Sequence, residues 1–328
     1  MLKRMFSSFG KIVATLAVLA VLLVVVAAGA IWAYFEWWAP RSDAERPAIS
    51  FAPLEDTTIR DPDNPTKVFR VDFARVEAEF PLSRDELMAL TPENLTRLSQ
   101  EEIDQIYGRL TAGPIPDGAH QGTLFFARGD SLRQRLGEIL GGLPGRLADD
   151  KLDILERVGG ALWKGKMVDR EAGTLRNFIE DLRPISGLID DVDTVPTATV
   201  PRGGFLGLFR PTTSVWLLFP AKVYCGQSLV DGRRESIIVD YAFADEIEGY
   251  RKSPDGLAGR NGLRIRDEIR MVRPGFYLGR AYANRAFLLN FTLYRPEVAD
   301  AGAEAFTAGE PLVEDCWTGE QVRSAAAP

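Results

Sequence analysis

The second half of the chain is dominated by short runs in which apolar and polar residues alternate. Alternation with a period of two puts successive side chains on opposite faces of an extended backbone, which is typical of β-strands. It predicts strands over residues 122–127, 161–168, 174–179, 214–224, 236–242, 263–272, 276–282 and 286–294. The strands follow one another with short connections, so the expected fold is mainly β, an antiparallel up-and-down β-barrel with helical additions.

Turn residues separate several of these runs. Asp231-Gly232 precedes the strand that starts at Ser236, and this dipeptide is a strong hairpin signal. Pro274-Gly275 and Asn284-Arg285 lie between the last three strands. The last three strands are therefore expected to form a meander with minimal turns.

The region before the strands carries helix-start signals. Ser83 and Ser99 are each followed three residues later by a glutamate, the spacing of a capping box, and Thr91-Pro92 places a proline at the first position of a helix. These signals predict two or three short helices over 83–111. Amphipathic spacing predicts one further helix over 131–143, and a short one is expected over 147–157.

The N-terminal region has a different texture. Residues 12–34 form a run of 23 residues without a charge, long enough to span a hydrocarbon core of about 30 Å. Aromatic residues crowd its C-terminal end, and cations lie on its N-terminal side, which predicts a single-pass helix with a cytoplasmic N-terminus. The alternative is a signal peptide cleaved after Ala30, because Ala28-Gly29-Ala30 fits the small-x-small rule.

Both the anchor and the signal-peptide hypotheses predict that everything after about residue 40 is exported. In a Gram-negative source this means an inner-membrane protein with a periplasmic body. The expected organisation is a cytoplasmic stub and transmembrane anchor over 1–38, a tether over 39–66 and a small helical segment over 67–112. A barrel-like domain over 113–318 and a disordered tail over 319–328 complete it.

Composition narrows the class of function. The 328 residues are 46% apolar and carry 39 Lys and Arg against 46 Asp and Glu. Three of the cations precede the first acid, Glu36, so the remainder holds 36 cations against 46 acids, a net charge of −10. An acidic body argues against binding to a nucleic-acid backbone. The sequence contains no phosphate-binding loop or short catalytic motif, and no cofactor or metal is expected.

The predicted export bears on whether the two cysteines form a disulfide. Cys225 and Cys316 are the only cysteines, in a compartment that permits disulfides. A bridge between them would tie the C-terminal segment to the body. The alternative is two separate thiols. The single histidine, His120, stands in a turn context before the first strand of the body and is interpreted as a surface or capping residue.

Period-two counting picks out candidate interior residues. On the strand over 263–272, Asp267 shares a face with Ile265 and Ile269, while the charged face with Glu268 and Arg270 is expected to be solvated. A carboxylate among apolar neighbours needs a partner, and Arg280 on the next strand is the candidate. The pair either lines a ligand site or is a structural ion pair, with Lys164 and Lys166 on the outside. The candidate ligand-binding residues are Asp267, Arg280, Asp240, Tyr282 and Trp163.

Three segments of the chain together resemble a family signature. Gly160-Ala-Leu-Trp163, Asp240-Tyr241 and the late-strand Arg280 are similar to the G-x-W, T-D-Y and Arg signature of lipocalins, with one extra residue before the tryptophan and Val239 in place of the threonine. The resemblance covers residues 120–295. It implies an eight-stranded cup that holds hydrophobic ligands.

An unusual glycine-rich segment follows Pro201. It sets Phe205, Leu206 and Phe209 among glycines, which predicts an apolar lip that touches lipid or closes over a ligand; the alternative is an ordinary loop packed on the core. The leading functional hypothesis is a membrane-anchored, exported protein that binds a hydrophobic or lipid-like ligand. The alternatives are an enzyme (an isomerase, cyclase or hydrolase) with a barrel carboxylate as acid or base, and a docking scaffold.

Overall fold

The structure is a computed structural model that describes residues 46–53, 58–61, 64–127, 163–201, 212–319. Residues 47–328 form one compact unit. The apolar run over 12–34, the helices expected over 131–143 and 147–157, the lip with Phe205, Leu206 and Phe209, and most of the C-terminal tail lie outside the described residues. Within the described part of the chain, no helix has the length and apolar character needed to cross a membrane.

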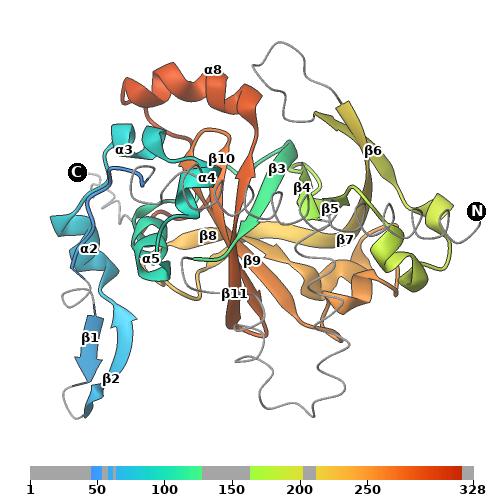
Figure 1. The fold of residues 1–328 in the computed structure, drawn as a ribbon, viewed down its shortest axis with the longest axis horizontal. Coiled ribbons are helices and arrows are strands. Elements are labelled where there is room, and N and C mark those ends of the chain that lie inside the picture. Colours follow the sequence, from blue (N-terminus) through green and yellow to red (C-terminus); the bar gives the residue numbers. More distant parts are fainter. Residues whose placement is uncertain (1–45, 54–57, 62–63, 128–162, 202–211, 320–328) are drawn as a thin grey trace, which may run out of the picture. The chain divides into compact units, whose positions relative to one another are not determined.

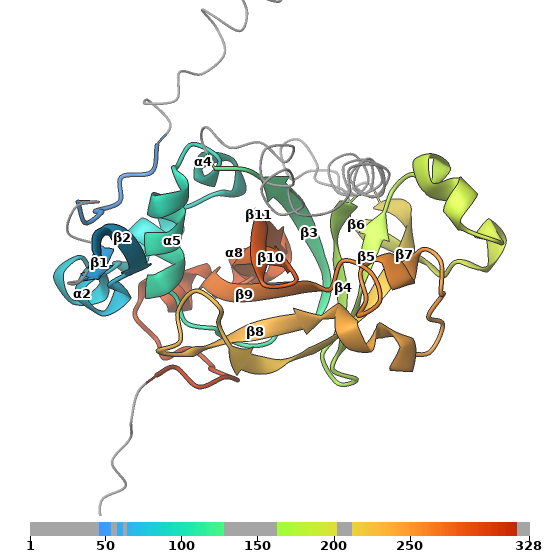
Figure 2. The ribbon, with the colours of Figure 1, turned by 90° about the horizontal axis from the view of Figure 1, so that it is seen from below.

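Eight of the described strands close into an antiparallel barrel (Figures 1 and 2). They are β3 (Gly118–Phe125), β4 (Trp163–Asp169), β5 (Thr174–Ile179), β7 (Thr212–Gln227), β8 (Glu235–Asp240), β9 (Ile265–Arg273), β10 (Phe276–Ala283) and β11 (Ala286–Tyr294). Each pairs with the next along the barrel, and β11 pairs with β3 to close it. The predicted mainly β, up-and-down barrel is confirmed, because adjacent runs of alternating residues each pair with their neighbour in sequence.

The longest strand, β7, also pairs with a further strand that was not predicted from the sequence. β6 (Thr197–Pro201) pairs with the first half of β7, and β8 pairs with its second half. Trp216 is paired on both sides, with Ile179 of β5 and with Thr197 of β6. Phe219 has a positive φ of 51° at the point where the register between β5 and β7 shifts. One strand, β7, therefore pairs with the barrel strands β5 and β8 and also with β6.

The predicted tight turns of the meander are present. Gly275 adopts a φ of 68° between β9 and β10. Asn284 and Arg285 have φ values of 46° and 75° between β10 and β11. Two consecutive residues with positive φ are the signature of the turn whose twist matches that of antiparallel strands. Asp231-Gly232 lies in the connection between β7 and β8, as expected.

Short helices lie along one side of the barrel (Figure 1). They are α2 (Phe73–Glu79), α3 (Arg84–Ala89), α4 (Pro92–Leu95) and α5 (Gln100–Arg109). Both expected capping boxes form, at Ser83 with Glu86 and at Ser99 with Glu102, because each serine accepts from the backbone N–H of the glutamate whose carboxylate caps it in return. Pro92 opens α4 as predicted.

The remaining elements are small. Part of the expected tether is paired: β1 (Thr58–Asp61) and β2 (Asn64–Val71) form a two-stranded sheet. A C-terminal helix, α8 (Pro296–Thr307), follows the last barrel strand. In the described part of the chain, four short 3-10 helices connect the strands: η3 (Arg183–Leu188), η4 (Val192–Thr194), η6 (Tyr241–Glu246) and η7 (Asp255–Leu257).

The helices give the barrel a second apolar core on its outside. Buried residues of this core include Leu95, Ile103 and Ile106 from the helices, and Val272 and Phe276 from the barrel strands. The helical segment therefore packs directly on strands β9 and β10. Burial of these side chains stabilises the fold by about 25 cal/mol for each Å² of apolar surface removed from water.

This outer core overturns one expectation about β9. The face with Glu268 and Arg270 was expected to be solvated, yet both residues are 0% exposed. The alternation did separate the two faces of the strand correctly. It could not show that helices cover the charged face, because a covered polar face and a solvated one have the same sequence period.

Candidate functional site

The inside of the barrel contains a cavity of about 510 Å³. Its walls are mainly apolar, and its lining includes Leu124, Phe126, Trp163, Ile179, Phe219, Leu257, Ala258, Ile265, Ala281, Leu288, Leu289 and Phe291. The lining also includes Asn261, which is exposed, so the cavity reaches the molecular surface. A chamber of this size and composition is within the usual range for a small-molecule site, about 300–1,000 Å³.

Four buried polar residues meet at the wall of this cavity. They are Lys166 on β4, Asn177 on β5, Tyr241 just after β8, and Asp267 on β9. The Nζ of Lys166 donates to Asn177 Oδ1 at 2.8 Å, to Tyr241 Oη at 2.7 Å and to Asp267 Oδ2 at 2.9 Å. Each of the four is at most 4% exposed. We call these four residues the polar cluster.

Strand register explains why these residues meet. Lys166 and Asn177 are directly paired between β4 and β5, so their side chains lie on the same face. Asp267 is paired with Val239, and Tyr241 follows Val239 by two residues, which returns it to the same side of the barrel. Three inward-facing strand positions and one at a strand end therefore bring the polar cluster together.

The charges of the cluster are fixed by its surroundings. Burial acts to lower the pKa of Lys166, but the charge of Asp267 and the hydrogen bonds that the ammonium donates outweigh it, so the pKa is raised. Burial and the nearby Asp267 raise the pKa of Tyr241 to about 12. At neutral pH Lys166 is thus an ammonium and Tyr241 a neutral phenol.

Aromatic rings surround the ammonium. Nζ of Lys166 lies 5.4 Å from the ring centroids of Trp163 and Tyr241 and 5.3 Å from that of Phe291. These distances are within the range of cation–π attraction. Trp163 also donates from Nε1 to Asn177 Oδ1 at 2.8 Å. The tryptophan therefore joins the cavity wall to the polar cluster.

Of the five predicted ligand-binding residues, the structure brings two to the cavity. Asp267 and Trp163 line it. Arg280 and Tyr282 lie on the opposite face of their strand, where Arg280 donates to Tyr282 at 3.0 Å and forms an ion pair with Asp104 of α5. Asp240 accepts from the hydroxyl of Tyr224 at 2.6 Å and from the backbone N–H of Ala242 at 2.8 Å. The last three are not part of the cavity lining.

The expected ion pair between Asp267 and Arg280 is therefore wrong. The residue of β10 opposite Asp267 is Ala281, and Arg280 stands opposite Glu268. A difference of one position reverses the face of the strand, so the arginine points outward beneath the helices. The partner of Asp267 is Lys166 instead.

Sequence reasoning missed three members of the polar cluster. Lys166 was expected on the outside, and Asn177 and Tyr241 were not singled out as site residues. A signal did exist for Asn177, which stands between Leu175 and Ile179 on an apolar face, as Asp267 does on its own strand. Lys166 likewise alternates with buried Val168.

His120 also differs from expectation. It is 2% exposed and lies with its ring 5.9 Å from that of Tyr277, in an edge-on arrangement. Burial lowers its pKa to about 4, only partly opposed by the hydrogen bond with the Gly118 carbonyl. His120 does not line the cavity and is a neutral packing residue of the barrel at neutral pH.

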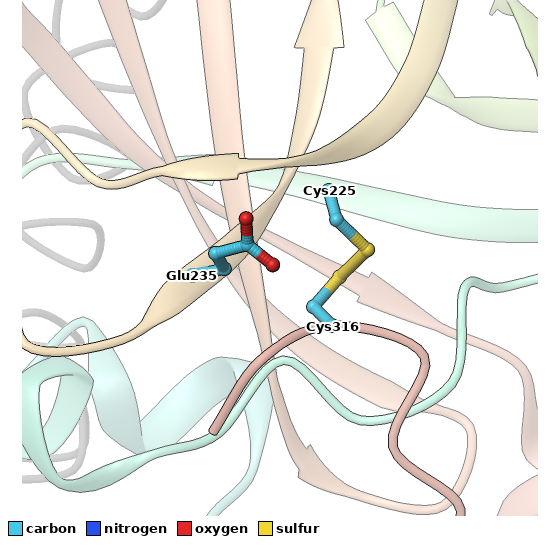
Figure 3. A group of neighbouring side chains, drawn as sticks. All are labelled: Cys225, Glu235 and Cys316. Carbon is cyan, nitrogen blue, oxygen red and sulfur yellow. A yellow bond between two sulfur atoms is a disulfide. The ribbon is translucent and has the colours of Figure 1, made fainter. Parts of the chain in front are cut away.

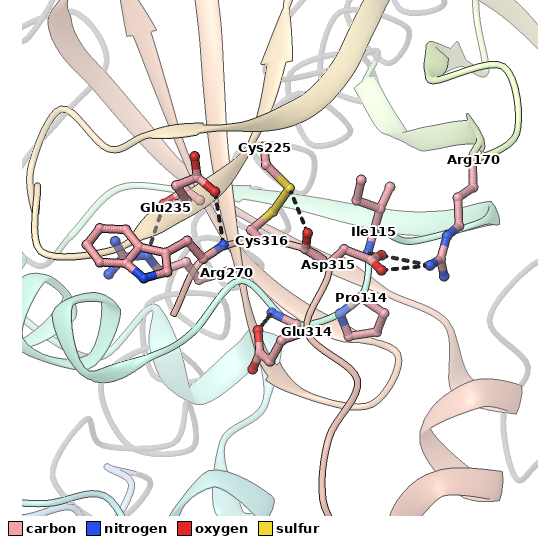
Figure 4. Close-up of a disulfide and its surroundings, with 12 residues drawn as sticks. Pro114, Ile115, Arg170, Cys225, Glu235, Arg270, Glu314, Asp315 and Cys316 are labelled. Carbon is pink, nitrogen blue, oxygen red and sulfur yellow. Dashed lines mark hydrogen bonds and ion pairs between the residues drawn. A yellow bond between two sulfur atoms is a disulfide. The ribbon is translucent and has the colours of Figure 1, made fainter. Parts of the chain in front are cut away.

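The predicted disulfide is present and joins β7 to the C-terminal segment. Cys225 and Cys316 are bonded, with Glu235 beside them (Figure 3). Because the sulfurs are bonded to each other, neither offers a thiolate to a metal ion. Glu235 accepts from the backbone N–H of Trp317 at 2.9 Å (Figure 4).

The same C-terminal segment is also held by residues before β3. Asp315 accepts from the backbone N–H of Ile115 at 2.7 Å, and Glu314 accepts from that of Gly113 at 2.8 Å (Figure 4). Arg170 forms an ion pair with Asp315 at 2.8 Å. The disulfide thus tethers a segment that already has specific contacts with the barrel.

Comparison with known proteins identifies no relative of this chain. No family model, curated protein or solved structure matches the chain. The eight-stranded closed barrel is compatible with the architecture of lipocalins without being specific to it.

Proposed function

We propose that this protein binds an apolar, lipid-like small molecule inside its barrel. The observation that carries the proposal is the cavity of about 510 Å³ whose wall includes a buried ion pair, Lys166 with Asp267. An apolar chamber with a few convergent polar groups is the usual composition of a small-molecule site. The apolar walls would hold the body of the ligand, and the polar cluster would fix one end.

The location of the ion pair supports binding over a purely structural role. Desolvating two charges is costly, and replacing a buried pair by apolar residues is often neutral or stabilising. A pair kept at the wall of a chamber is therefore more readily explained by recognition than by stability. The lipocalin-like interpretation agrees with this, because closed barrels of about eight strands can hold one small ligand.

The chemical state of Lys166 and Tyr241 does not suit either of them to act as a general base. A general base must be deprotonated near the operating pH. The raised pKa of Lys166 keeps it protonated, and the pKa of Tyr241, about 12, keeps the phenol neutral. A docking scaffold would need no chamber at all. Binding uses both the chamber and the cluster.

We also propose that the binding domain is exported and held at the membrane. The charge-free run over residues 12–34 supports an anchor, and the bond between Cys225 and Cys316 supports an oxidising compartment. A reporter enzyme that is active only after export, fused behind the barrel in a Gram-negative host, is expected to be active. An inactive fusion in a stably expressed protein would contradict export.

The binding proposal is tested with a neutral apolar dye. Nile red is expected to brighten on addition of the purified protein and to bind with a simple saturation curve. Ala281 lines the cavity, so Ala281→Phe is expected to weaken dye binding by at least about tenfold, which is about 1.4 kcal/mol. Val298→Phe on α8, where the side chain is 38% exposed, is the matched control and should bind as the original protein does.

Two results would contradict the proposal. One is the absence of dye binding to the folded protein, together with no molecule recovered by organic extraction and mass spectrometry. The other is dye binding that Ala281→Phe leaves unchanged, which would place the dye outside the barrel.

A further inference from the structure

We infer that the ligand presents a neutral hydrogen-bond donor to the polar cluster, so that it is an alcohol-type lipid and not a fatty-acid anion. This inference rests on the proposed binding function and names the ligand class for the same cavity. It follows from two properties of the cluster, its hydrogen-bond donors and its net charge.

The N–H donors of Lys166 and Asn177 are all engaged by acceptors of the protein. A lysine ammonium has three N–H groups, and those of Lys166 go to Asn177, Tyr241 and Asp267. The amide nitrogen of Asn177 donates to the carbonyl of Phe219 at 3.0 Å and to the hydroxyl oxygen of Tyr241 at 3.0 Å. The cluster therefore keeps no N–H of Lys166 or Asn177 for an incoming carboxylate.

The orientation of Asn177 is fixed by chemistry. Trp163 Nε1 and Lys166 Nζ can only donate, and both lie 2.8 Å from the same atom of Asn177. That atom must be the oxygen, so the amide nitrogen faces Phe219 and Tyr241. The hydroxyl hydrogen of Tyr241 is then left for Asp267 Oδ2 or Asn177 Oδ1, each of which lies 3.3 Å away.

An acceptor remains. Oδ2 of Asp267 accepts from Lys166 and lies within hydrogen-bond distance of the Tyr241 hydroxyl, whereas Oδ1 receives no hydrogen bond from any residue that the structure describes. Asp267 lines the cavity, so the unused acceptor belongs to a residue of the cavity wall. A carboxylate oxygen in such a site is satisfied by an O–H or N–H of the ligand, and such a charge-assisted bond is stronger than one between neutral groups.

The charges give the same answer. The ammonium of Lys166 and the carboxylate of Asp267 balance, and both are almost fully buried. An anionic head group placed there would be desolvated without a cation of its own, which is costly. Lys164 also lines the cavity, but its side chain is only partly buried, so water screens its charge. A neutral donor avoids this cost.

The test compares three probes that differ only at the polar end. Decanol, decanoate and decylamine are used to displace Nile red at a pH at which the acid and the amine are both ionised. Decanol is expected to bind at least about tenfold more tightly than either ion, a difference of about 1.4 kcal/mol. Decanoate binding as tightly as decanol would overturn the inference.

Variants of the ion pair should shift this preference in opposite directions. Asp267→Asn leaves Lys166 as the only charge of the cluster, so the ratio of decanoate to decanol affinity should rise at least about tenfold. Lys166→Met leaves the carboxylate, so decylamine should gain over decanol. The double variant restores neutrality and serves as the reference if one single variant does not fold. Variants that leave all the ratios unchanged would contradict the placement of the polar end.

Lys164→Met is the matched control for an alternative position of the ligand head. It removes a lining cation outside the polar cluster and should leave the order of the three probes unchanged. Strong decanoate binding that is lost in Lys164→Met would place an anionic head at Lys164 and overturn the inference. Failure of all three probes and of Nile red itself would instead reject the proposed binding function.

Discussion

The two faces of strand β9 carry buried ion pairs in very different surroundings. Asp267 points inward, pairs with Lys166 and lines a cavity. Arg270 points outward, where its guanidinium forms an ion pair with Asp231 at 2.9 Å and donates to the backbone carbonyls of Tyr107, Asp231 and Arg234. Both pairs are almost fully hidden from water.

The difference lies in how completely protein groups enclose each pair. Arg270 also donates to Ser236 and lies 4.8 Å from the ring centroid of Tyr107, so it connects β9, α5 and the β7–β8 connection. Glu268 beside it accepts from Ser228 at 2.7 Å and from the backbone of Leu229 at 2.8 Å. The outer pair fastens the helices to the barrel. The inner pair keeps an acceptor at the cavity wall, which suits recognition.

The largest effect on stability is expected for Arg270→Met. It leaves the buried Asp231 with fewer partners and removes donors from three backbone carbonyls, so the free energy of unfolding should fall by about 3–5 kcal/mol. Urea unfolding measures this. Lys222→Ala breaks an exposed pair with Glu246 and should cost less than about 1 kcal/mol. Equal losses in the two variants would contradict the structural role of Arg270.

A pH dependence should come from the buried histidine inside the barrel. Its pKa is about 4 in the fold against 6.5 in the unfolded chain, so only the unfolded chain takes up a proton between these values. Stability contributed by neutral His120 is therefore complete above pH 6.5 and is lost as pH falls toward 4, by roughly 3 kcal/mol in all. The difference in unfolding free energy between the original protein and His120→Gln should shrink by this amount.

This loss is measured by urea unfolding at several pH values, with the variant subtracting the effect of the acidic groups. A difference that does not change with pH would show that His120 is not held neutral by the fold.

A smaller effect should separate the two sides of the barrel by their packing. Leu278 is 0% exposed in the outer core, so Leu278→Trp should cost about 1–3 kcal/mol through overpacking. Ala281→Phe projects into the cavity and should change stability by less than about 1 kcal/mol. Thermal and urea unfolding of the two variants check this. A larger cost for Ala281→Phe would mean that the chamber is already filled by protein atoms.

The barrel strands were largely predictable from the sequence. Strands β5 (Thr174–Ile179) and β11 (Ala286–Tyr294) have the bounds that the alternation predicted, and the other barrel strands differ from the prediction at their ends. Period-two patterns and turn dipeptides are local signals, so one chain contains all the information needed to find them. β6 and α8 were not among the predicted elements, although residues 197–200 of β6 alternate and α8 is amphipathic.

The candidate site was only partly predictable. Asp267 was identified as a carboxylate on an apolar strand face. Trp163 was identified through the resemblance to the lipocalin signature. The ion-pair partner of Asp267 was assigned to the neighbouring strand, but Lys166 reaches it from β4, which is not adjacent to β9 in the sheet. Contacts across the inside of a closed barrel depend on shear and curvature, which no single strand encodes.

The sequence by itself determined the strands, their order, the capped helices and which residues share a strand face, because these depend on neighbours in the chain. Only the tertiary structure decided that helices cover the outer charged face and that Lys166, Asn177, Tyr241 and Asp267 meet. Barrel closure and helix packing bring together residues far apart in sequence. The energy of a buried charge depends on those neighbours.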